Sequence, residues 1–111
     1  MIYIIFLIPI MMIIIGYFMY KHPPKKINHI VGYRTSKSMK NKKNWTKANK
    51  MCGLLWLKIG IITFILSLIL FILNLLKVLN FTENLLTIIT IIQTLIIILP
   101  IPFIEKRLGD T

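Results

Sequence analysis

The segment KHPPKKINHIVGYRTSKSMKNKKNWTKANK, residues 21–50, decides the fold of this 111-residue chain. It carries ten Lys or Arg residues and no Asp or Glu, and apolar runs flank it on both sides. A soluble domain of this size would mix polar and apolar residues around one core, whereas long apolar runs separated by a charged loop are typical of integral membrane proteins. We therefore expect an all-α membrane protein, a single domain over residues 1–111, with a basic, partly helical interfacial loop between the first two of three transmembrane helices.

The apolar runs predict transmembrane helices over about residues 2–20, 53–76 and 85–103. Even the shortest of these reaches about 28 Å at a rise of about 1.5 Å per residue, enough to cross a hydrocarbon core. Pro9 lies inside the first run and predicts a kink. Lys58 lies near the start of the second run, where its ammonium group can reach the headgroups along its own alkyl chain.

The charge distribution predicts the orientation of the chain. Lys and Arg accumulate in cytoplasmic loops, so residues 21–50 and the C-terminal Lys106 and Arg107 are expected in the cytoplasm. The N-terminus and the nearly neutral loop 77–84 are then outside. The net charge of +11 is better explained by this rule and by contact with anionic lipid than by nucleic-acid binding, which we do not expect.

Local signals divide the basic loop into two parts. Pro23 and Pro24 end the first helix, and a helix is expected from about Ser38, with Ser38 as its N-cap. Spacing places a set of polar and small residues on one face of that helix, with lysines on the other: Asn41, Trp45, Ala48, Asn49 and Cys52. This pattern predicts an in-plane interfacial helix anchored by Trp45 and its lysines.

Arg34 is the loop's candidate binding residue. Its guanidinium offers five donors in a fixed fork, suited to a phosphate or a carboxylate. It could bind a lipid headgroup, a peptide or a partner's carboxylate, or it could tether the loop to the C-terminal tail through Glu105. The residues alone leave both interpretations open.

Polar residues also occur at helical spacing within the second and third apolar runs. They predict packing of these runs as an antiparallel hairpin, because hydroxyl and amide groups bond across helix interfaces in lipid. The predicted packing residues are Gly60, Thr63, Ser67, Thr90, Gln93 and Thr94. A polar conduit is the alternative, but no Asp, Glu or His lies mid-membrane to relay protons, so a carrier or pump is not expected.

The chain shows no pattern that indicates catalysis. It has no Ser/His/Asp arrangement, no carboxylate pair, no Gly-rich phosphate loop and no zinc motif. Its one cysteine, Cys52, is expected to be a small core residue. We expect no enzymatic activity, no cofactor and no metal ion.

A spaced set of loop residues resembles the SdpI family of small bacterial integral membrane proteins. The resemblance rests on INHIVGYRT at 27–35, SMKN at 38–41, WTKANK at 45–50 and Gly53. It extends to the layout of one helix before the loop and two after it, and it implies a location in the bacterial plasma membrane. The positions that it implies for binding are Asn28, Gly32, Arg34, Thr35, Asn41, Trp45 and Asn49.

The family's best-known member gives immunity to a secreted peptide toxin and also acts as a receptor that holds a repressor at the membrane. This chain resembles its C-terminal three-helix part. The resemblance implies an immunity protein that binds a toxin or a membrane partner. The alternatives are a small accessory subunit, binding anionic lipid or a transporter or signalling partner through the basic loop, and a small permease or pore. Expected partners are thus anionic lipid, a peptide toxin, a membrane protein or repressor, and a second copy of the chain in a homo-oligomer.

Overall fold

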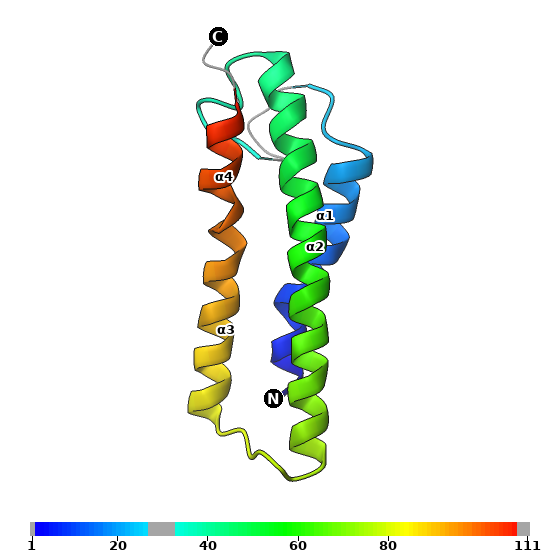
Figure 1. The fold of residues 1–111 in the computed structure, drawn as a ribbon, viewed down its shortest axis with the longest axis vertical. Coiled ribbons are helices and arrows are strands. Elements are labelled where there is room, and N and C mark those ends of the chain that lie inside the picture. The colour runs from blue at the N-terminus through cyan, green and yellow to red at the C-terminus, as the bar shows by residue number, and fades with distance from the viewer. Residues whose placement is uncertain (1, 27–32, 109–111) are drawn as a thin grey trace.

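The computed structural model describes residues 2–26 and 33–108, and these residues form helices and no β-strand (Figure 1). The elements are η1 (Ile2–Phe6), α1 (Leu7–Lys21), α2 (Lys42–Leu75), α3 (Glu83–Ile98) and α4 (Pro100–Arg107). They form a bundle 55 Å long and 22 Å across. In the described part of the chain, three helical stretches are long and apolar enough to cross a membrane: Ile2–Lys21, Lys42–Leu75 and Glu83–Arg107. The all-α fold with three candidate spans, expected from the sequence, is confirmed.

Helix α2 is the longest element and runs without a break from the basic loop into the membrane span. Its 34 residues reach about 51 Å, well beyond a hydrocarbon core of about 30 Å. The expected separate in-plane helix is therefore wrong: the helical part of the loop is the first turns of α2. The expected cap is also wrong, because Asn41 caps the helix by accepting a hydrogen bond from the Asn44 N–H at 2.8 Å.

Glycines bring α1 close to α2, and this is the most extensive helix contact in the bundle. A Cβ added at Gly16 would lie 2.7 Å from the carbonyl oxygen of Gly53. A Cβ at Gly60 would lie 2.9 Å from Cγ1 of Ile13, which is also on α1. Gly60 thus packs against α1, whereas the sequence suggested α3 as its partner. Close backbone approach at small residues is the usual means of helix association in lipid.

η1, α2 and α3 meet at the main-chain carbonyl of Ile5, which Pro9 leaves without a helical hydrogen-bond partner. Proline has no N–H, so the carbonyl of Ile5, four residues earlier, loses its partner in a regular helix. The Ser67 hydroxyl and the Gln93 amide both donate to this carbonyl, each at 2.9 Å, and Gln93 also donates to Ser67 Oγ at 3.1 Å. All three polar groups are buried. The predicted contact of Ser67 with Gln93 is therefore present, and it forms around a carbonyl of the first span.

Thr63, Thr90 and Thr94, which the sequence predicted to pack with Ser67 and Gln93, form hydrogen bonds within their own helices. The hydroxyl of Thr63 donates to the Ile59 carbonyl at 2.8 Å, and Thr90 and Thr94 likewise donate to carbonyls four residues earlier. Their proton is used within the helix, so the cross-helix hydrogen bonds expected for them are not formed. Outside these contacts the bundle exposes Leu and Ile side chains, as a lipid-facing surface requires.

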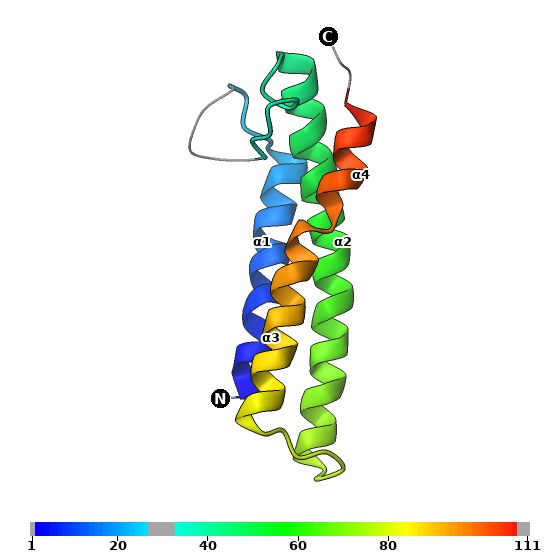
Figure 2. The same cartoon turned by 90° about the vertical axis from the view of Figure 1, so that its left-hand side faces the viewer.

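The third span breaks at Leu99, and Pro100 starts α4 as its first residue. The Trp56 indole donates to the Ile97 carbonyl at 3.1 Å, which satisfies one of the last carbonyls of α3. Figure 2 shows α4 continuing from α3 toward the first turns of α2. Ile104 and Leu108 are buried there in a cluster with residues of the loop and α2.

Candidate functional site

The basic loop is folded onto α2 by the amide of Asn49, which is fully buried. Its Oδ1 accepts from the Tyr33 N–H at 2.8 Å, and its Nδ2 donates to the Trp45 carbonyl at 2.9 Å. An amide can do both because it carries an acceptor and two donors. Asn49 therefore fixes the position of the main chain next to Arg34.

Ser38 shapes the turn that follows. Its Oγ accepts from the Thr35 N–H at 2.8 Å and can donate to the Thr35 carbonyl at 2.8 Å. The Thr35 hydroxyl in turn accepts from the Ser38 N–H at 3.1 Å. Asn44 on α2 donates to the Lys37 carbonyl at 3.0 Å, so the turn is also held to the helix.

Trp45 joins the two ends of the loop. Its side chain is completely buried, and its indole N–H donates to the Pro24 carbonyl at 2.7 Å. The expectation that Trp45 anchors the chain in the membrane interface is therefore wrong. Its role in the structure is to hold the exit of α1 against the first turn of α2.

Glu105 on α4 ties the loop to the C-terminal tail. Its carboxylate accepts from the hydroxyl groups of Tyr33 and Thr35, both at 3.1 Å, and its carbonyl accepts from Lys37 Nζ at 3.1 Å. Burial, and then the negative charge of Glu105, raise the pKa of Tyr33 above its ordinary value, so the phenol remains a donor. The tether to Glu105, one of the two interpretations left open for Arg34, is thus made by its neighbours.

Arg34 itself is exposed and lines an open cavity of about 440 Å³. Tyr33, Thr35 and Cys52 also line it, and its apolar lining includes Ile15 and Met19 of α1, Trp56 of α2 and Ile101 of α4. Among the described residues no carboxylate forms an ion pair with Arg34: Glu105 accepts hydrogen bonds from Tyr33 and Thr35, and Glu83 begins α3 at the other end of the bundle (Figure 1). The cavity therefore combines a planar cation, without a carboxylate partner in the part of the chain that the structure describes, with a mostly apolar lining.

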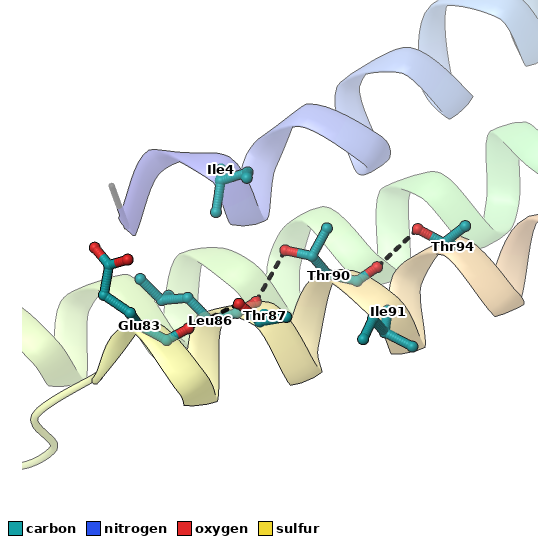
Figure 3. A pocket seen from close by; sticks show the side chains of 7 residues that line it. All are labelled: Ile4, Glu83, Leu86, Thr87, Thr90, Ile91 and Thr94. Carbon is teal, nitrogen blue, oxygen red and sulfur yellow. Dashed lines mark hydrogen bonds between the residues drawn. The ribbon is translucent and has the colours of Figure 1, made fainter.

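A smaller cavity of about 260 Å³ lies at the opposite end, between α3 and η1. Figure 3 shows Thr87, Thr90 and Thr94 along α3, with Ile4 of η1 across from them. Each threonine hydroxyl donates to a carbonyl of its own helix, at 2.8–2.9 Å. These contacts stabilise the helix and leave no free donor from the threonines for a ligand.

The structure brings five of the residues implied by the resemblance to one end of the bundle: Arg34, Thr35, Asn41, Trp45 and Asn49. Asn28 and Gly32 lie outside the described residues. Four of the five bond within the protein, so Arg34 is the one that faces a cavity without a protein partner among the residues described. Sequence reasoning missed Tyr33 and the turn-forming role of Ser38, although both fall within the motifs that carried the resemblance.

No cluster of three or more His, Cys, Asp or Glu side chains occurs in the ranges that the structure covers. With three apolar spans and the described part of the basic loop packed on the second, the fold defines a small multi-pass membrane protein. A sequence model of the SdpI/YfhL protein family matches residues 25–104, and the chain belongs to this family.

Comparison with a curated relative supports this assignment. The chain is 38% identical over 52 residues to an uncharacterized protein YfhL of Bacillus subtilis (strain 168), and the match covers 47% of each chain. In this match, the chain thus spans about half the length of that relative. No solved structure matches the chain.

Proposed function

We propose that this protein is a non-enzymatic immunity protein, which protects its cell from a secreted peptide toxin by binding the toxin or a membrane partner. The observation that carries the proposal is the position of Arg34, which is exposed, lines the cavity and has no carboxylate partner among the described residues. Membership of the SdpI/YfhL family supports the same class of function.

The construction of the loop favours binding. Asn49, Ser38 and Glu105 fix the main chain on both sides of Arg34 through hydrogen bonds of 2.8–3.1 Å. A segment whose main chain is already held, as at Tyr33 and Thr35, loses little conformational freedom when a partner binds, so more of the contact energy appears as affinity. Arg34 can then present its fork to a carboxylate or phosphate in a defined orientation.

We further propose that the loop end faces the cytoplasm. The loop and α4 lie at the same end of the bundle, which gathers the ten basic residues of 21–50 with Lys106 and Arg107 (Figure 1). The loop 77–84, which leads from α2 into the start of α3, lies at the other end and carries one lysine and one glutamate. This asymmetry is what the positive-inside rule requires.

The test is protection of a sensitive bacterial host that expresses the chain. Cells are challenged with culture supernatant of the strain that carries the gene, and survival is compared at matched protein levels. Arg34→Lys keeps the charge but loses the two-pronged contact, so we expect it to abolish protection. Lys42→Ala, on an exposed side chain, should protect like wild type. Full protection by Arg34→Lys would exclude a specific contact at this residue.

A second candidate is an accessory subunit that binds anionic lipid or another membrane protein through its lysines. Lys43, Lys47 and Lys50 are exposed and follow one another at helical spacing on the first turns of α2. They form a continuous basic face next to the proposed membrane surface. Co-purification of a membrane protein without toxin, lost in a triple Lys→Gln variant of this face, would favour this alternative.

A further inference from the structure

The cavity beside Arg34 has the chemistry of a site for an amphiphile. Its lining combines the Arg34 guanidinium with mostly apolar side chains, and the hydroxyl groups of Tyr33 and Thr35, which also line it, already donate to Glu105. The Trp56 N–H is bonded to the Ile97 carbonyl, so this residue offers the cavity no free donor. The volume of about 440 Å³ falls in the range of about 300–1,000 Å³ that is usual for small-molecule sites.

The position of the cavity along α2 places it at a membrane boundary. Lys50 is the last basic residue of the loop segment and is exposed, and Trp56 follows six residues later. At about 1.5 Å per residue these two positions are about 9 Å apart along the helix axis. The part of the cavity lined by Trp56 thus lies within about 9 Å of the end of the basic segment along α2, where lipid headgroups are expected.

Charge selects among the amphiphiles present there. Among the described residues, Arg34 has no carboxylate partner, and the surrounding loop segment holds nine further basic residues and no acid. A guanidinium at such a site binds phosphate oxygens in a planar two-pronged geometry. A cationic or zwitterionic headgroup would bring its own positive charge close to these basic residues, and the like charges would repel each other.

We infer that this cavity is a specific site for one anionic phospholipid, whose phosphate contacts Arg34 and one of whose acyl chains lies along Ile15, Met19, Trp56 and Ile101. Part of that chain occupies the cavity, and the rest of the lipid lies outside it in the bilayer. The inference concerns lipid binding and is independent of the immunity role, since it can be measured without any toxin.

The experiment is native mass spectrometry of the full chain, released from neutral detergent containing equal amounts of phosphatidylglycerol and phosphatidylcholine. Wild type should retain one phosphatidylglycerol in preference to phosphatidylcholine. Arg34→Gln should lower this preference about tenfold, the usual effect of losing a hydrogen-bonded contact to a charged group. Lys42→Gln removes the same charge from an exposed position outside the cavity and should leave the preference unchanged.

Two additions make the result decisive. Ile101→Trp fills the apolar wall while retaining Arg34, so it should also lose the bound lipid if the acyl chain lies there. Circular dichroism should show equal helix content in all variants. Equal retention of the two lipids, equal losses in Arg34→Gln and Lys42→Gln, or a peptide retained in place of the lipid would overturn the inference. Binding of glycerol 3-phosphate at the affinity of the whole lipid would do so as well.

Discussion

The phenol of Tyr33 donates a hydrogen bond to the carboxylate of Glu105 at 3.1 Å, although the two residues are 72 positions apart. Thr35 donates to the same carboxylate oxygen, also at 3.1 Å. The contact closes the loop over the C-terminal helix and covers a small cluster that includes Cys52 and Ile104. The arrangement that exposes Arg34 therefore depends on an acid at the far end of the sequence.

Removal of this acid should open the loop. Glu105→Ala leaves two hydroxyl donors without their charged acceptor, at a cost of about 1–3 kcal/mol in the free energy of unfolding. Cys52 is the only cysteine and is buried, so its maleimide labelling in detergent should become faster. Glu83→Ala, an exposed acid at the other end, should leave the labelling rate unchanged. Equal rates in wild type and Glu105→Ala would show that the carboxylate does not hold the loop.

Asn49 should be essential for the fold of the loop. Asn49→Ala leaves the buried Tyr33 N–H without its acceptor, which costs about 1–3 kcal/mol. We expect a lower melting temperature and faster trypsin cleavage at the loop lysines. Asn80→Ala, at an exposed position of the α2–α3 hairpin, is the matched control and should behave as wild type. Trypsin resistance unchanged in Asn49→Ala would contradict this role.

Ser67 and Gln93 should show strongly non-additive effects, because each alone can satisfy the Ile5 carbonyl. Ser67→Ala and Gln93→Leu should each cost no more than about 0.6–2 kcal/mol, the usual worth of a hydrogen bond between helices in lipid. The double variant leaves the carbonyl without a donor and should be destabilised by more than the sum. Thermal unfolding in detergent measures the difference.

Pro9→Ala provides a direct check of this mechanism. It restores an N–H four residues after Ile5, so it should recover part of the stability lost in the Ser67→Ala, Gln93→Leu double variant. In the wild-type background the same substitution should have a smaller effect, because the carbonyl is already satisfied. No recovery would mean that the free carbonyl is not the source of the non-additivity.

The orientation can be tested with single cysteines in a Cys52→Ala background. Lys42→Cys should resist a membrane-impermeant maleimide in intact cells and react after lysis, because the basic loop is expected in the cytoplasm. Asn80→Cys should react in intact cells. Both positions are exposed in the structure, so a lack of reaction reports the membrane side and not burial. Labelling of Lys42→Cys in intact cells would reverse the proposed topology.

The sequence alone determined the class of fold, because that depends on properties summed over contiguous residues. Whether a run of apolar residues favours the bilayer is set by its length and its few charges, and both can be read directly from residues 2–20, 53–76 and 85–103. The loop motif likewise identified the family, which was confirmed. Pro9, where the sequence predicts a kink, lies in the first turn of α1, just after the 3-10 helix η1.

Only the tertiary structure decided which residues meet. Gly60 packs on α1 and not on α3, Ser67 and Gln93 meet at the Ile5 carbonyl, and Glu105 bonds to Tyr33 and Thr35 while Arg34 remains exposed. In lipid, apolar side chains gain little by choosing one helix over another, so pairing depends on close approach and a few hydrogen bonds. These depend on the positions of atoms distant in sequence, and no local pattern encodes them.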